Sequence, residues 1–433
     1  MEIITDLHLH SKYSRAVSGQ MVIPEIARWA KKKGIGLVGT GDWTHPLWLR
    51  ELKESLVEVG EGIFRYKNEP RGVLFVLSTE ISSIYTQNGK PHRIHNLVLA
   101  PSFSVVEEIN NKLRSRGVNL LSDGRPTTGL SSIELCEIVF SVSRDCLVIP
   151  AHVWTPWYSL YGSSSGFDSL KECFGEFSNQ IYAVETGLSS DPAMNWRIEE
   201  LDNRSIVSFS DAHSPQKLGR EATVFEFSDQ RPVISYQQIK EAIIQSPVTS
   251  HQSPRIAYTI EFYPEEGKYH YTGHRNCGVK QSPEETRRLG ETCPVCGRHL
   301  TVGVMHRVEE LATQPSGYRP ASRPPYKMLV PLVEILSEAL SSGISSQIVE
   351  SEYNRLTENF SSEFAVLLKT PIEEIAKIAG EKVAEGIKKV RSGEIVIDPG
   401  YDGVFGTVRI WSASAGASAD KEKQMSLFLL VLD

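Results

Sequence analysis

The sequence predicts an α/β fold in which strands and helices alternate along residues 1–250. Short apolar runs such as GVLFVLSTEIS (residues 72–82) and CLVIPAH (residues 146–152) alternate with helical stretches such as PEIARWAKKKG (residues 24–34). This alternation is typical of a parallel-rich barrel or sheet. Histidine and acidic residues follow the apolar runs, and α/β barrels place their chemistry at the carboxyl ends of strands. We therefore expect a functional site at that edge.

Length and composition narrow the class of protein. At 433 residues the chain exceeds one ordinary core, so a large domain with smaller ones is expected. The composition, 40% hydrophobic and 23% charged, is that of a globular protein. The net charge of −7 argues against a uniformly basic nucleic-acid coat but leaves room for a local basic groove. No apolar run is long enough to span a membrane and no signal peptide is evident, so we expect a cytoplasmic protein with no membrane partner.

Changes in composition divide the chain into four expected parts. Residues 1–250 form the α/β domain, and a region rich in Tyr, Gly and Cys covers 251–312. A mainly helical C-terminal domain is expected at 326–411, where Pro371 and Gly393 bound one periodic stretch. Residues 412–423 are small and polar, so 412–433 is predicted to be a flexible tail.

The stretch DLHLH (residues 6–10) carries two histidines that alternate at the end of an apolar run. On an extended chain His8 and His10 project from the same face, which is a metal-chelating arrangement. Further imidazoles and carboxylates follow later apolar runs: Asp42, Glu80, His95, His152, Asp211 and His213. Imidazole and carboxylate without thiolate suit zinc, manganese or iron acting as a Lewis acid, and one carboxylate can bridge two ions.

In this order the residues resemble the PHP (polymerase and histidinol phosphatase) superfamily. The resemblance implies a distorted (β/α)7 barrel that holds two or three divalent ions (Zn, Mn or Mg). It implies these ligands, with Glu80 as the bridge: His8, His10, Asp42, Glu80, His95, His152, Asp211 and His213. Asp42 stands where relatives often have histidine, and His95 is preferred to His92. Glu185 is expected to support the ligands, while His45 either completes a third site or caps a helix.

A second metal motif lies in residues 274–296. His274-x-x-Cys277 is followed by Cys293-x-x-Cys296, which supplies four N/S ligands for one tetrahedral structural zinc ion. His270 and His299 are alternatives for the fourth ligand. A glycine after Cys277 and after Cys296 suits the tight turn of a zinc knuckle. Such a closed site stabilises a module, and an enzyme that binds a polymer has more use for it than one that binds a small molecule.

Several longer segments narrow the resemblance to one family. These are HVWTPWYSLYGSSSGFDSL (residues 152–170), SDAHSPQKLGREAT (residues 210–223), the knuckle and PGYDGVFG (residues 399–406). Together they resemble the endonuclease Q family over residues 1–411. The resemblance implies a metal-dependent hydrolase for DNA repair that nicks DNA on the 5′ side of a deaminated base (uracil, hypoxanthine or xanthine) or an abasic site. The products would carry 3′-hydroxyl and 5′-phosphate ends.

The residues offer roles for such a substrate. A deaminated base differs by one exocyclic group, so it must leave the base stack to be tested. The predicted base pocket consists of Trp154, Trp157, Tyr158 and Ser164, next to His152. The predicted phosphate contacts are Lys12, Arg15 and Arg220, which follow the metal motifs. We expect Asp211, His213 and Arg220 to be catalytic.

The tail ends in an apolar motif at Gln424, Leu427 and Phe428. It is similar to the short peptides with which repair proteins bind a sliding clamp, either PCNA or the bacterial β clamp. A packed terminal strand is the alternative.

Two other functions remain open at this point. The chain can be a PHP-type phosphoesterase for a small phosphorylated metabolite or nucleotide, with the zinc module serving assembly alone. It can also be a metal-stabilised, clamp-associated scaffold without turnover. Activity on sugar phosphates without DNA affinity favours the first, and a biological role that survives loss of Asp211 favours the second.

Overall fold

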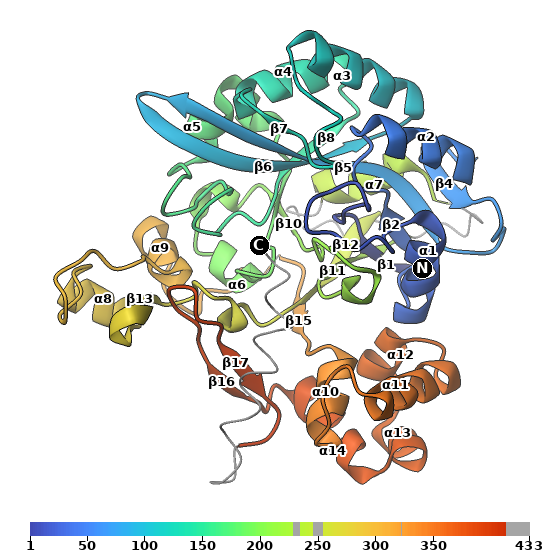
Figure 1. Cartoon of the computed structure of the whole chain (residues 1–433), viewed down its shortest axis with the longest axis vertical. Helices are drawn as coiled ribbons and strands as arrows, with labels where there is room; N and C mark the ends of the chain where they lie inside the picture. Colours follow the sequence, from blue (N-terminus) through green and yellow to red (C-terminus); the bar gives the residue numbers. More distant parts are fainter. Residues whose placement is uncertain (228–233, 246–253, 322, 413–433) are drawn as a thin grey trace.

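The computed structural model describes residues 1–227, 234–245, 254–321 and 323–412, and it is a mixed α/β structure with a central sheet (Figure 1). The strands of the central sheet are β1 (Glu2–Asp6), β2 (Leu37–Gly39), β3 (Leu56–Gly60), β4 (Ile63–Tyr66), β5 (Leu74–Gln87), β6 (Lys90–Ala100), β7 (Thr127–Thr128), β8 (Leu147–Pro150), β11 (Ala222–Glu226), β12 (Arg255–Glu261) and β15 (Tyr326–Met328). The α/β class is therefore as predicted.

The pairing of the strands shows which strand ends lie at the same edge of the sheet. The main path runs β15-β12-β11-β1-β2-β5-β4-β3, while β6 pairs with β5 and β8, and β7 pairs with β5. The β1-β2-β5 core is parallel, so these strands end at one edge. β5 and β6 form a long antiparallel hairpin above that core in Figure 1.

A closed barrel is not confirmed. The strands β9 (Ala183–Glu185) and β10 (Ser205–Val207) pair with each other as a separate two-stranded sheet. Among the described residues, no backbone ladder joins β8 to β9 or β10 to β11. Side chains cross the second gap, since the Thr223 hydroxyl donates to the Ser208 carbonyl and accepts from the Ser208 amide. Alternation of strands and helices predicts neighbours along the chain, but it does not say whether every pair of neighbouring strands is joined by backbone hydrogen bonds.

Helices cover the sheet and follow the expected local signals. Those of the first 245 residues are α1 (Ile23–Lys33), α2 (Pro46–Ser55), α3 (Phe103–Ser115), α4 (Ser132–Val142), α5 (Leu170–Phe174), α6 (Pro192–Asn195) and α7 (Tyr236–Gln245). In α1, Pro24 lies in the first turn and Gly34 ends the helix in the left-handed conformation. Its buried apolar residues Ile23, Ile26, Ala27 and Ala30 lie on one face, which packs on the core.

Two small parts of the chain extend from the sheet, one to the left and one downward in Figure 1. The cysteine-rich region forms β13 (Thr272–His274), β14 (Val279–Gln281), α8 (Pro283–Leu289) and α9 (Val304–Leu311). A hairpin of β16 (Val396–Asp398) and β17 (Thr407–Arg409) lies after the helical region. The expected domain boundaries at residues 250, 312 and 326 stay predictions.

The C-terminal helices gather in one group at the lower right of Figure 1. They are α10 (Leu332–Ala339), α11 (Gln347–Asn359), α12 (Glu363–Leu368), α13 (Ile372–Ala379) and α14 (Glu381–Ser392). Pro371 precedes α13 and Gly393 follows α14, as the sequence indicates. Gly380, with φ of 83°, separates these two helices. The clamp motif lies outside the described residues, and none of the described helices is long and apolar enough to cross a membrane.

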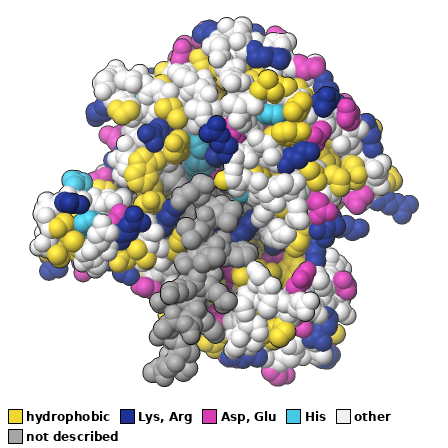
Figure 2. All heavy atoms as spheres, in the orientation of Figure 1, with side chains coloured by type: hydrophobic (Ala, Val, Ile, Leu, Met, Phe, Trp, Pro, Cys, Tyr) yellow, Lys and Arg dark blue, Asp and Glu magenta, His cyan; other side chains and the backbone are white. Residues whose placement is uncertain are grey.

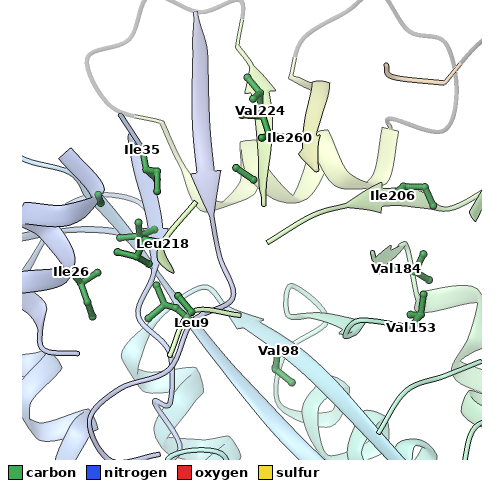
Figure 3. Close-up of a cluster of buried hydrophobic side chains, with 14 of the residues drawn as sticks. Leu9, Ile26, Ile35, Val98, Val153, Val184, Ile206, Leu218, Val224 and Ile260 are labelled. Atoms are coloured by element: carbon green, nitrogen blue, oxygen red, sulfur yellow. The ribbon is translucent and has the colours of Figure 1, made fainter. Parts of the chain in front are cut away.

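A continuous apolar core lies under the carboxyl ends of the strands. Leu9, between the two histidines, belongs to one cluster of buried apolar side chains that also includes Val98, Val153 and Val184 (Figure 3). Leu9 is 1% exposed and Val153 is fully buried. The residues between and beside the polar side chains of the site are therefore part of the core, which holds their backbone in place.

A buried ion pair attaches the C-terminal helices to α1. The Lys33 ammonium lies 2.6 Å from Glu363, and both side chains are at most 6% exposed. The same carboxylate accepts hydrogen bonds from the Tyr353 hydroxyl and the Leu332 amide. Every oxygen of the Glu363 carboxylate therefore has a partner, as a buried charge requires.

Replacing Glu363 by alanine would leave Lys33 buried without its counter-charge. We expect Glu363→Ala to lower the free energy of unfolding by about 3–5 kcal/mol, measured by urea denaturation. The exposed Glu373→Ala on α13 serves as a control and should change stability by less than about 0.5 kcal/mol. Equal urea denaturation midpoints for Glu363→Ala and Glu373→Ala would contradict a stabilising role for the Lys33–Glu363 ion pair.

Candidate metal centre

The predicted ligands converge from separate strands. His8 and His10 follow β1, Glu80 lies within β5 and His95 within β6, while His152 follows β8. Asp211 comes after β10, and the loops after β1 and β10 meet where the His10 amide donates to the Ala212 carbonyl at 3.0 Å. Histidine and carboxylate side chains from strands that are far apart in the sequence therefore lie close together.

A first group contains His8, His10, Glu80 and Asp211, whose ligand atoms lie within 4.8 Å of one another. His10 Nε2 is 3.0 Å from Asp211 Oδ1 and 3.3 Å from Glu80 Oε2. His8 Nε2 is 3.6 Å from both carboxylates. This spacing of nitrogen and oxygen atoms suits a divalent ion among them.

A second group contains Glu80, His95 and His152. Glu80 Oε1 is 2.8 Å from His95 Nδ1 and 3.1 Å from His152 Nε2. Glu80 therefore belongs to both groups: its Oε1 faces His8, His95 and His152, and its Oε2 faces His10. That is the geometry of a carboxylate able to bridge two ions.

Carboxylates behind the first group orient the two leading histidines. His8 Nδ1 donates to Glu185 at 3.0 Å, and His10 Nδ1 donates to Asp42 at 3.0 Å. Each contact places a proton on Nδ1 and leaves the Nε2 lone pair toward the group, as in metal-bound imidazoles. Glu185 thus supports the ligands, as expected.

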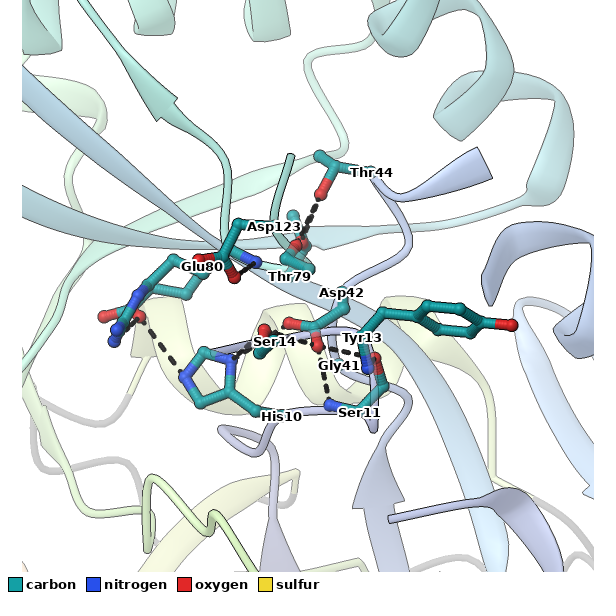
Figure 4. Close-up of polar contacts among 12 residues, drawn as sticks. His10, Ser11, Tyr13, Ser14, Gly41, Asp42, Thr44, Thr79, Glu80 and Asp123 are labelled. Atoms are coloured by element: carbon teal, nitrogen blue, oxygen red, sulfur yellow. Dashed lines mark hydrogen bonds and ion pairs between the residues drawn. The ribbon is translucent and has the colours of Figure 1, made fainter. Parts of the chain in front are cut away.

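Asp42 differs from its expected place among the ligands. It lies behind His10, where its oxygens also accept from the Ser11 amide and from the hydroxyls of Ser11 and Ser14 (Figure 4). It is fully buried and is not among the groups of potential ligands found in the described residues. The structure therefore assigns Asp42 to positioning His10. The aspartate in place of a histidine was the only sequence signal of this difference.

The charges of the site are strongly coupled. Burial disfavours the Glu80 carboxylate, but His95, Arg125 and His8 outweigh burial and hold the pKa of Glu80 well below its usual value. Burial likewise opposes a charge on His8, yet Glu185, Asp211 and Glu80 raise the pKa of its imidazole well above the ordinary value. The pocket therefore stabilises positive charge next to its carboxylates, whether protons or metal ions supply it.

The donor set also fits a metal ion at the level of single atoms. Among the described residues, buried polar atoms without a hydrogen-bond partner include His8 Nε2, His10 Nε2 and Asp211 Oδ1. Buried polar atoms usually have a partner, and these three point at one another. A cation among them would satisfy all three.

The backbone at the site is held in an uncommon conformation. Asp42, His152 and Asp211 have φ angles of 48°, 33° and 47°, in the left-handed region that residues other than glycine seldom adopt. Next to His152, a side chain on Gly187 would collide with the His152 Cβ atom. Glycine at this position is therefore required for the close approach of the two loops.

The remaining predicted residues divide into those near the centre and those away from it. The His213 ring is 4.8 Å from the His10 ring, and its Nδ1 donates to the Asp211 carbonyl. Arg220 instead lies 4.0 Å from Glu334 on α10 and over the ring of Phe262. The structure thus does not place Arg220 against the histidines, which corrects the expectation of a catalytic contact there.

Two other predicted phosphate contacts lie at the rim. Lys12 pairs with Glu51 at 3.0 Å, and the Arg15 side chain is 81% exposed, 3.5 Å from Asp123. Arg125 is a residue that sequence reasoning missed. Its guanidinium lies 3.0 Å from Glu80 Oε2 and is 26% exposed. It belongs to a loop with no preceding strand end, so no pattern in the sequence marked it.

The predicted base pocket is only partly open. Trp154 is fully buried and its indole nitrogen donates to Asn195, so the structure places it in the core, which corrects its assignment to the pocket. Trp157 is 37% exposed, and the ring of Tyr158 lies 4.8 Å from that of His95. Ser164 is exposed on the same loop.

The zinc motif forms one compact group. Ligand atoms of His274, Cys277, Cys293 and Cys296 lie within 4.8 Å of one another. Gly278 and Gly297 have φ of 65° and 72°, which the knuckle turns need. Burial disfavours a charged thiol, but hydrogen bonds from His274 and from nearby amides lower the pKa of Cys293 to about 6. The set therefore fits a structural zinc ion.

Neither alternative histidine joins this group. His270 is buried, and burial lowers its pKa to about 4. His299 faces Glu291 at 3.0 Å instead.

Comparison with solved structures identifies the family. The lesion-specific endonuclease PfuEndoQ from Pyrococcus furiosus is 36% identical, with a TM-score of 0.82, over 96% of this chain and 98% of that one. The chain belongs to the endonuclease Q family. Another family structure, a complex of Endonuclease Q with a 27-mer duplex carrying an abasic lesion at the active site, matches at 36% identity and a TM-score of 0.81, over 97% and 100% of the two chains.

Sequence comparisons add one family model and two uncharacterized proteins that resemble this chain. Residues 331–394 match the model of the MJ0043 C-terminal domain. The uncharacterized protein MJ0043 of Methanocaldococcus jannaschii is 36% identical over 258 residues, which are 59% of this chain but 31% of that protein. The uncharacterized protein YqxK of Bacillus subtilis is 29% identical over 427 residues, covering 94% of this chain and 99% of YqxK.

An amide at position 42 would test whether this residue sets the orientation of His10. We expect Asp42→Asn to weaken Mn²⁺ binding about 10–100-fold, because the neutral amide holds the Nδ1 proton less firmly. Titration of the folded chain with Mn²⁺ measures this, since the thiolate site disfavours that ion. Glu51→Gln is the control. Glu51 lies on α2 and contacts Lys12 and Tyr13, which belong to the loop that follows His10, but the contacts found for it include no histidine. An unchanged affinity in Asp42→Asn would exclude the positioning role.

Proposed function

We propose that this chain is a metal-dependent DNA repair endonuclease that nicks the phosphodiester 5′ to deaminated bases (uracil, hypoxanthine and xanthine) and to abasic sites. The observation that carries the proposal is Glu80, a buried carboxylate that two groups of metal-ligating side chains share. Membership of the endonuclease Q family supports DNA as the substrate, since one relative is lesion-specific and another is complexed with an abasic duplex.

The residues present fit two ions. His8, His10, Glu80 and Asp211 would hold one, and Glu80, His95 and His152 the other, with His213 adjacent. Bound ions of this kind lower the pKa of water and offset the charge that develops on phosphate oxygens. Hydrolysis would leave a 3′-hydroxyl and a 5′-phosphate. The Cys-containing group would hold a structural zinc ion.

Arg125 is proposed as the phosphate contact nearest the centre. Its guanidinium binds Glu80 on one side and remains a quarter exposed. A guanidinium so placed can donate to a non-bridging phosphate oxygen while keeping the bridging carboxylate in position. The side chain of Asp211 is also partly exposed, at 27%.

Selection of the damaged base is assigned to the loop after His152. A deaminated base or an abasic site is recognised outside the stack, where aromatic faces and hydrogen-bonding groups can test it. Trp157 and Tyr158 supply such faces, and Arg93 lies 5.4 Å from the centre of the Tyr158 ring. Tyr158 also contacts His95, so a base held there would lie beside the second ligand group.

Incision of a labelled duplex with one deoxyuridine, deoxyinosine or abasic site tests the proposal. With Mn²⁺ or Mg²⁺ present, we expect a single nick 5′ to the lesion, and we expect Asp211→Ala to lower its rate more than about 100-fold through loss of a ligand. Glu199→Ala, an exposed carboxylate, should nick at the wild-type rate. Intact damaged duplexes together with hydrolysis of a small phosphate ester would support the small-molecule phosphoesterase instead.

We also propose that the tail binds a sliding clamp through Gln424, Leu427 and Phe428. The sequence motif alone supports this, as the tail lies outside the described residues. Leu427→Ala combined with Phe428→Ala should lower affinity for PCNA or the bacterial β clamp at least tenfold, measured with both clamps by surface plasmon resonance. Nicking of a short linear duplex without a clamp should stay unchanged. Equal clamp affinity of this variant and the wild type would refute the motif.

A further inference from the structure

The zinc-binding module contains a second group of metal-ligating side chains that the knuckle does not use. Glu291, His306 and Glu310 each offer one ligand atom, and these atoms lie within 4.8 Å of one another. We propose that these three residues bind a second divalent cation of the borderline class, such as zinc or manganese, within the module. This site is separate from the Cys-containing group and from the active centre.

The geometry within α9 favours chelation. His306 and Glu310 are four residues apart, so their side chains share one face of the helix. His306 Nε2 lies 3.7 Å from Glu310 Oε1 and 3.7 Å from Glu291 Oε1. These separations are too long for hydrogen bonds. They are close to the separation of about 3.3 Å between neighbouring ligands around a zinc ion with bonds of about 2.0–2.1 Å.

The second oxygen of each carboxylate already has a partner. Arg307 lies 3.2 Å from Glu310 Oε2, and His299 Nε2 lies 3.0 Å from Glu291 Oε2. His299 is itself oriented, because its Nδ1 donates to the Leu300 carbonyl. Each carboxylate is therefore turned so that one oxygen, Oε1, faces His306.

Burial and ligand type point to the same class of ion. The His306 side chain is 8% exposed, and it lies between two carboxylates that are about one-third exposed. One imidazole and two carboxylates provide nitrogen and oxygen ligands without thiolate. The two carboxylate oxygens that face His306 supply the negative charge that a divalent cation needs.

The position of the site gives the ion a role in the fold. Glu291 lies two residues before Cys293, while α9 carries Arg307, whose guanidinium donates to the carbonyls of Tyr161 and Phe167. An ion between Glu291 and α9 would join the knuckle to the helix that contacts the loop after His152. The orientation of the module relative to the proposed base pocket would then depend on this ion.

Metal content of the full chain tests the proposal. After equilibration with Zn²⁺ and gel filtration, we expect His306→Gln and Glu310→Gln to contain one equivalent less zinc than the wild type. Glu284→Gln on α8, an exposed carboxylate, should match the wild type. Replacement of zinc by Co²⁺ should give all four proteins the same thiolate charge-transfer band, which shows that the knuckle is intact.

Location of the ion provides a second readout that needs no variant. Anomalous diffraction at the zinc edge from crystals of the zinc-loaded chain should show a peak between His306 and Glu310. Equal zinc content in all four proteins, or the absence of that peak, would overturn the proposal. Neither readout depends on whether the chain nicks DNA, so the two proposals fail separately.

Discussion

The arrangement of the whole site depends on one buried carboxylate, that of Glu80. It is fully buried, and its two oxygens contact four imidazoles and one guanidinium. A buried carboxylate is costly unless its oxygens are paired, so the strands around β5 must place positive or proton-donating groups against it. The histidines from β1, β6 and β8 meet this requirement. The same requirement makes the place suitable for metal ions.

The geometry around Glu80 is held by groups that have no direct contact with it. Asp42 and Glu185 hold the outer nitrogens of His10 and His8, and serine donors surround Asp42 in turn. The left-handed backbone at Asp42, His152 and Asp211 is unfavourable by itself, at about 1–3 kcal/mol for each residue. The apolar core that includes Leu9 and Val153 offsets this strain and supports the backbone next to the predicted ligands. Rigid placement of ligands is what a metal centre needs for catalysis.

Ion pairs anchor the smaller parts of the chain to the α/β part. Arg307 of α9 contacts the loop that follows His152, and Arg197 pairs with Glu309 of the same helix at 2.6 Å. On the opposite side, Lys33 and Glu363 tie the C-terminal helices to α1.

On the face that Figure 2 shows, Lys and Arg are dispersed among Asp and Glu, in keeping with a net charge of −7. On that face, contact with a polyanion would therefore depend on local basic groups.

The sequence by itself determined the α/β class and which histidine, carboxylate and cysteine side chains come together in groups, because these features depend on local patterns. Alternating His8 and His10, the strand-end residues and the Cys-x-x-Cys spacing act over a few residues, and strand direction then brings them together. The tertiary structure alone decided the roles that depend on distant neighbours. Asp42 is a hydrogen-bond partner of His10, and Trp154 is buried in the core. Arg220 lies beside Glu334, and Arg125 forms an ion pair with Glu80. No local pattern contains that information, since the contact of a side chain is set by which strands and loops pack beside it.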